Sequence, residues 1–146
     1  MSKSDKYQEL YKKIEAVVSG EADPIANMAN TAALIHEDFG FWWTGFYIVK
    51  DNELVLGPFQ GPVACTRIGF GKGVCGTAWK KEETIVVPDV HAFPGHIACS
   101  SLSLSEIVVP IFNDSHVKAV LDIDSKEYST FDSVDREWLE KIVGLL

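Results

Sequence analysis

Two pairs of strand-like segments, each joined by a short polar turn, constrain the fold of this chain more than any other feature. The segments are rich in β-branched and aromatic residues and span 41–49, 53–56, 106–112 and 117–124. The turns at 51–52 and 113–116 are short enough to join neighbouring antiparallel strands directly. Because the first segment is apolar on both faces, we expect it to lie in the middle of the sheet.

Helical patterns flank these strands. Caps and apolar spacing place the helices at residues 7–18, residues 25–35 after an Asp23-Pro24 N-terminus, a short helix beginning near Val74, and a final helix capped by Asp132. A short strand is expected at 84–87, and residues 88–103 lack periodicity and are typical of a functional loop. The pattern predicts one α+β domain over residues 1–146, with the helices packed on one face of an antiparallel sheet.

The charge balance excludes several classes of partner. The 146 residues include 21 acidic and 13 basic side chains, a net charge of −8, which disfavours binding to nucleic acid and to anionic membranes. No apolar run approaches the roughly 20 residues that a membrane span needs. The N-terminus lacks the apolar region of a signal peptide, so we expect a soluble, cytoplasmic protein.

Three cysteines, Cys65, Cys75 and Cys99, carry the candidate redox chemistry, and their odd number argues against a secreted disulfide scaffold. Cys99 lies in the 88–103 loop, where backbone N–H groups and a neighbouring imidazolium of His96 would lower its thiol pKa and favour a nucleophilic thiolate. An inert thiol is the equally weighted alternative. Cys75 lies in a short apolar turn and is interpreted as buried and structural.

Two acidic residues interrupt an apolar strand. Asp122 and Asp124 alternate with apolar residues, so both project from one face. Carboxylates at this spacing raise each other's proton affinity, and partial burial adds to the effect, which keeps a proton donor available at neutral pH. The alternative is a polar face toward solvent, because Lys118 shares that side.

Glu106 is a possible third acid. In a regular hairpin closed at 113–116, residue 107 opposes Asp122, which leaves Glu106 on the other face. A three-residue loop or a bulge near Pro110 would bring it to the side of Asp122.

Trp43 and Tyr47 share one face of the first strand, where they form either core or the wall of a small-molecule pocket, with Gly45 leaving room between them.

Residues 71–76 match a dinucleotide-binding glycine pattern but lack the surrounding βαβ unit. His91, His96 and Cys99 fit no standard zinc spacing. We therefore expect neither a cofactor nor a metal.

Several long motifs, in this order, resemble the stand-alone GAF-domain enzymes called free methionine-(R)-sulfoxide reductases. The resemblance covers nearly the whole chain, and the cysteine spacings of ten and 24 residues are also similar. The motifs are FWWTGFY (41–47), GPVACTRI (61–68), GKGVCGT (71–77), DVHAFPGHIACSS (89–101), SEIVVPI (105–111) and LDIDS (121–125).

The resemblance implies an antiparallel sheet of about six strands and a redox role for the thiols. By position Cys99 matches the nucleophile and Cys65 its resolving partner, while the role of Cys75 stays open. Glu106, Asp122 and Asp124 match the acids that hold the sulfoxide, and Trp43 and Tyr47 match the aromatic pocket lining. The implied activity is reduction of free methionine-(R)-sulfoxide through sulfenic acid and disulfide intermediates, recycled by thioredoxin.

Two alternatives remain: a non-catalytic GAF module that binds a small ligand or senses oxidation, and a structural interaction module. A homodimer through the N-terminal helices is a further expectation.

Overall fold

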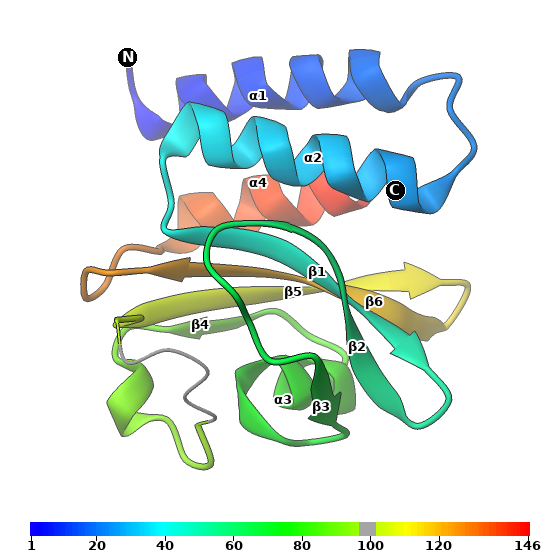
Figure 1. Ribbon diagram of the computed structural model, residues 1–146. Coiled ribbons are helices and arrows are strands. Elements are labelled where there is room, and N and C mark those ends of the chain that lie inside the picture. Colours follow the sequence, from blue (N-terminus) through cyan, green and yellow to red (C-terminus); the bar gives the residue numbers. More distant parts are fainter. Residues whose placement is uncertain (97–101) are drawn as a thin grey trace.

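A six-stranded antiparallel sheet forms the middle layer of the protein (Figure 1). In the computed structural model, which describes residues 1–96 and 102–146, the strand order is β3-β2-β1-β6-β5-β4. The strands are β1 (Trp43–Lys50), β2 (Glu53–Gln60), β3 (Arg67–Gly69), β4 (Ile85–Val87), β5 (Ser105–Asn113) and β6 (His116–Ser125). Both predicted hairpins are confirmed, and β1 occupies the central position expected for residues 41–49.

The β2 and β3 strands extend beyond the sequence prediction. β2 continues to Gln60 rather than ending near Leu56, and β3 was not predicted. The three residues of β3 carry too little alternation to indicate a strand, and they pair with Glu53, Leu54 and Val55 of β2. Pairing across the sheet, rather than local preference, therefore defines β3.

Three helices cover one face of the sheet: α1 (Lys3–Val18), α2 (Pro24–Phe39) and α4 (Ser133–Val143) (Figure 1). Ser2 and Asp132 begin α1 and α4 with capping boxes, and the Asp23 carboxylate caps α2 by accepting the N–H of Ile25 at 2.8 Å. The predicted caps at Asp23 and Asp132 are confirmed. No helix among the described residues is long and apolar enough to cross a membrane.

The alternation along β6 separates two apolar clusters. Ala119, Leu121 and Ile123 point to the helical face, where they pack with side chains of α1, α2 and α4 in the larger core. Val120 points to the opposite face and packs with the second cluster. From Ala119 onward, the even-numbered positions of β6 therefore look away from the three long helices.

The opposite face carries the short helix α3 (Gly73–Lys81), which also contacts the edge strand β3, and the 3₁₀ helix η1 (Val90–Ala92) (Figure 1). The start of α3 agrees with the helix expected near Val74. The expectation that the helices lie on one face holds for the three long helices, whereas α3 packs against β5 and β6 from the other side.

Candidate active site

A β-bulge places Glu106 on the face that carries Asp122 and Asp124. The strand register shifts between Ile111 and Phe112, so that Glu106 lies opposite Asp124 instead of on the other face. The irregularity expected near Pro110 is thus confirmed, but the extra residue lies in β6, between the partners of Ile111 and Phe112. The three acids therefore share one face, the face opposite the long helices.

The bulge also removes Lys118 from the face of the acids. Phe112 pairs with Val117 and Ile111 pairs with Ala119, which leaves Lys118 as the extra residue of β6. Its ammonium donates to the carbonyl of Leu146 at 3.4 Å, on the side covered by α4. The expectation that Lys118 shares the side of Asp122 is wrong, because it assumed a regular strand without a bulge.

The three carboxyl groups form a buried, strongly interacting cluster. Glu106 and Asp122 are 6% and 5% exposed, and Asp124 keeps partial exposure. Burial raises the pKa of Glu106 and of Asp124 well above their usual ranges, and the neighbouring carboxylates raise both pKa values further. Burial also raises the pKa of Asp122, but hydrogen bonds from Glu106 and Cys75 favour its charged form. The cluster therefore holds protons at neutral pH and titrates as one unit.

Cys75 lies against this acid cluster, in the first turn of α3. Its sulfur and one oxygen each of Glu106 and Asp122 lie within 4.8 Å of one another. Burial raises the pKa of the Cys75 thiol well above its usual range, and the charges of Asp122, Glu106 and Asp124 raise it further. The prediction that Cys75 is buried is confirmed, and its thiol stays protonated at neutral pH. A cation held by these three donors would have to displace their protons.

Aromatic side chains of β1 form the wall beside the acids. Trp43 and Tyr47 lie on the acid face, since Trp43 pairs with Asp124 and Tyr47 pairs with Val120 across β6. The Trp43 ring stacks on Tyr47 at 6.0 Å between centroids and on Phe59 at 5.3 Å. Gly45 leaves space for this stack, because a Cβ atom there would lie 2.6 Å from the Trp43 ring.

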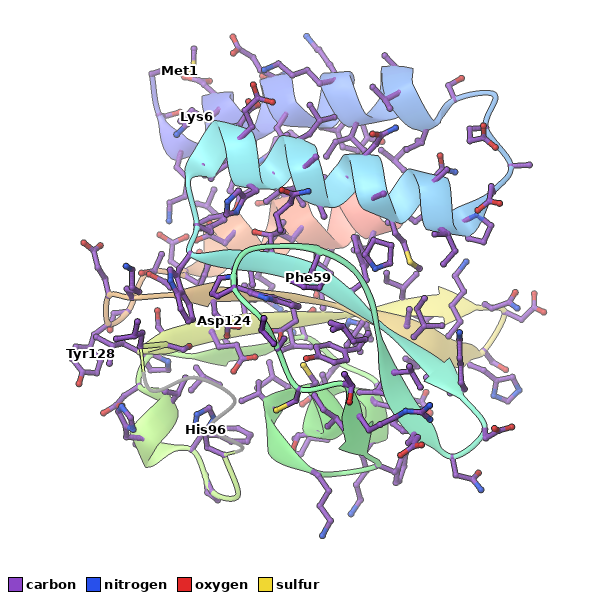
Figure 2. The ribbon with its side chains drawn as sticks, viewed as in Figure 1. Met1, Lys6, Phe59, His96, Asp124 and Tyr128 are labelled. Atoms are coloured by element: carbon purple, nitrogen blue, oxygen red, sulfur yellow. The ribbon has the colours of Figure 1, made fainter. Side chains whose placement is uncertain are left out.

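Acids, aromatic residues and α3 line one pocket, which encloses about 600 Å³ including the space at its open mouth. Trp43, Tyr47, Cys75, Glu106, Asp122 and Asp124 all contribute to its wall. In Figure 2, Asp124 and His96 both lie on the side of the sheet away from α1 and α2. The structure thus brings together six of the eight predicted site residues in one cavity.

The other two predicted site residues are Cys65 and Cys99. Cys65 lies between β2 and β3, next to the pocket-lining residue Ala64, and it is disulfide-bonded, whereas Cys75 is free. Cys99 lies outside the described residues. Its predicted role as nucleophile therefore stays a prediction.

His96 lines the pocket. Burial lowers the pKa of His96, and the nearby His91 lowers it further, which favours the neutral imidazole. The expected imidazolium beside Cys99 stays a prediction, because Cys99 lies outside the described residues.

Two pocket atoms point to a polar ligand. Asp122 Oδ1 and His96 Nδ1 are buried and have no hydrogen-bond partner among the residues described.

Three further lining residues, Lys72, Val74 and Trp42, were not predicted from the sequence. They lack a local signal, because only the packing of α3 and the loop before β1 against the acid face brings them to the pocket.

The sequence and the fold are similar to those of known proteins. The GAF domain family matches residues 22–146. The free methionine-R-sulfoxide reductase of Saccharomyces cerevisiae is 44% identical, over 100% of this chain and 86% of the relative, and that of Escherichia coli is 44% identical, over 100% and 89%.

A solved structure gives the same result. The free methionine-R-sulfoxide reductase from Neisseria meningitidis, in complex with its substrate, is 54% identical and has a TM-score of 0.97, over 99% of this chain and 88% of that chain. The similarity extends over the acid cluster, the aromatic wall and α3. The chain therefore belongs to the GAF domain family and, within it, to the free methionine-R-sulfoxide reductases.

Proposed function

We propose that this protein reduces the R epimer of free methionine sulfoxide to methionine. The observation that carries the proposal is the buried cluster of three carboxyls with raised pKa values, Glu106, Asp122 and Asp124, in a pocket walled by aromatic rings. The proteins from S. cerevisiae, E. coli and N. meningitidis that are 44%, 44% and 54% identical to this chain bear the name of that activity.

The acid cluster supplies what a sulfoxide needs in order to react. Sulfoxide oxygen leaves sulfur poorly until it is protonated, and a protonated carboxyl beside it is a general acid. Asp124 is the best-placed donor, because it keeps partial exposure in the pocket while its pKa is raised. The aromatic rings of Trp43 and Tyr47 offer an apolar surface for the S-methyl end of the substrate.

Cys99 is the proposed nucleophile. Its thiolate attacks the sulfoxide sulfur while the acid cluster protonates the oxygen. Overall, the oxygen atom passes from the substrate to Cys99, so that the sulfoxide is reduced to the thioether and Cys99 is oxidised to a sulfenic acid. Protonated acids, unlike carboxylates, do not disfavour a thiolate beside them.

Cys65 is the proposed resolving cysteine. Its thiol attacks the sulfenic sulfur, water leaves, and a disulfide forms, which a thioredoxin-type dithiol then reduces by exchange. Two observations favour Cys65 over Cys75 in this role. Cys65 is disulfide-bonded, whereas the Cys75 thiol is free and buried, and burial is the main cause of its raised pKa.

An assay of NADPH consumption with thioredoxin and its reductase tests the proposal. Free methionine-R-sulfoxide, its S epimer and a peptide-bound R-sulfoxide are supplied separately. We expect turnover with the free R epimer alone, and we expect Cys99→Ser to abolish it. Binding of the free R epimer without any turnover by reduced protein would instead identify a ligand-sensing GAF module.

The expected homodimer through the N-terminal helices stays a prediction. Val17 of α1 and Ile25 of α2 are exposed apolar side chains that such a contact would cover. Sedimentation at several protein concentrations tests it directly.

A further inference from the structure

The segment 61–66, which carries Cys65, is anchored by the walls of the pocket. It has no regular secondary structure, and residues 61–63 are exposed. Two side chains of β1 hold it: the Trp43 indole donates from Nε1 to the carbonyl of Pro62 at 3.0 Å, and the Tyr47 hydroxyl donates to the carbonyl of Cys65 at 2.8 Å. A backbone bond from the N–H of Leu56 to the carbonyl of Thr66, at 3.0 Å, also holds the segment.

Each of the two side-chain anchors is itself held in place. The Trp43 ring is stacked on Phe59, and a Cβ atom at Gly61, where φ is +130°, would lie 2.7 Å from Trp43 Cδ1. The backbone at Gly61 therefore passes close against the indole, in a conformation that favours glycine. Tyr47 is buried in the middle of β1, so its hydroxyl has little freedom to reach another acceptor.

We infer that Tyr47 and Trp43 are positioning residues for Cys65: besides lining the substrate pocket, they hold the resolving cysteine where it can reach the oxidised nucleophile. This inference rests on the proposed function. The hydrogen bond from Tyr47 ends on the carbonyl of Cys65 itself, so it restrains the residue whose sulfur must react. Apolar contact with a substrate would not require that bond.

The anchors act on the second chemical step. In that step the Cys65 thiol attacks the sulfenic sulfur, the sulfenic oxygen leaves as water with the thiol proton, and an S–S bond forms. The rate depends on how often the Cys65 sulfur occupies the reactive position, because the step is intramolecular. A restrained segment raises that fraction without changing the chemistry of the first step.

Tyr47→Phe removes the hydroxyl and keeps the ring. Reduced protein is mixed with one equivalent of free methionine-R-sulfoxide and quenched at short times. Methionine release reports the first step, and trapping of the sulfenic acid with a cyclic 1,3-dione reports how long it survives before the disulfide forms. Loss of one hydrogen bond predicts a roughly two- to ten-fold fall in the disulfide rate relative to the release rate. The matched control is Tyr128→Phe, at an exposed tyrosine that does not line the pocket.

The ratio of the two rates decides between the possible roles. An unchanged ratio, whether or not both rates fall, would overturn the inference and leave Tyr47 as pocket lining only. Trp43→Phe, which removes the second donor, is expected to lower the same ratio and provides the test if Tyr47→Phe does not fold. If wild-type protein releases no methionine while binding the substrate, the proposed function fails, and that outcome is visible before any variant is compared.

Discussion

Replacing Asp124 with Asn tests the acid cluster most directly, because the change removes one ionisable proton and almost no volume. Asp124 lies opposite Glu106 on β5 and opposite Trp43 on β1, so the amide would occupy the same place between the same neighbours. The amide is far too weak an acid to protonate a sulfoxide. We therefore expect slower chemistry without loss of the fold.

The expected size of the rate loss follows from the role of a general acid. Positioned proton donors contribute roughly 10²–10⁴-fold, which corresponds to about 2.7–5.4 kcal/mol of activation free energy. The wild-type rate should also fall as pH rises through the raised pKa values of the cluster, because the donor is then lost. In Asp124→Asn this dependence should shift, since the charge of Asp124 no longer raises the pKa of Glu106.

The effect of Asp124→Asn on stability should be opposite in sign to its effect on the rate: relative to wild type, the variant should gain stability as pH rises. The folded-state pKa of Asp124 is raised, so its contribution to stability is complete below the unfolded pKa of about 4 and is lost as pH rises through the folded pKa. Asn carries no such pH-dependent loss. The free energy of unfolding of Asp124→Asn relative to wild type should therefore increase with pH, by at most about 1.4 kcal/mol per pH unit.

Two measurements over the same range, from about pH 5 to about pH 9, check these expectations. Rapid-quench single turnovers give the rate of methionine release, and urea denaturation gives the free energy of unfolding. The control is Asp51→Asn, at an exposed turn residue with φ of 57°, a conformation that Asn adopts readily. An unchanged rate together with a pH-independent stability difference would refute a proton-holding cluster at Asp124.

Three further predictions concern the resolving cysteine, the pocket and the core. Cys65→Ser should still reduce about one equivalent of substrate but lose at least roughly ten-fold in cycling with thioredoxin; normal cycling would assign the resolving role to Cys75. Gly45→Ala places a Cβ against Phe59 and 2.6 Å from the Trp43 ring, so we expect it to cost about 1–3 kcal/mol of stability and to raise KM; an unchanged KM would show that the aromatic wall does not contact the substrate. Tyr7→Phe breaks a buried 2.6 Å hydrogen bond to Asp135 and should lower the free energy of unfolding by about 1–3 kcal/mol in urea titrations; a loss within error would contradict a role for this bond in joining α1 to α4.

The helix caps, the hairpins and the central strand could be predicted because short stretches of sequence carry their signals. The caps at Asp23 and Asp132, both hairpins and the central place of β1 follow from side-chain hydrogen bonding, turn chemistry and apolar periodicity. Strand β3 did not follow, because three residues carry no period and pair only where β2 offers an edge. The site residues were identified largely through the resemblance to the free methionine-(R)-sulfoxide reductases.

Alternation along the strand is enough to place Asp122 and Asp124 on one face, because successive side chains of a strand point to opposite sides. It could not determine that Glu106 joins them. That depends on one extra residue, Lys118, at the bulge in β6, and a shift of one residue moves every side chain of a strand to the other face. The raised pKa values of the three acids also depend on the tertiary structure. Only the packing of α3 over the sheet buries the three carboxyls together, and burial and proximity, rather than residue type, are what raise their pKa values.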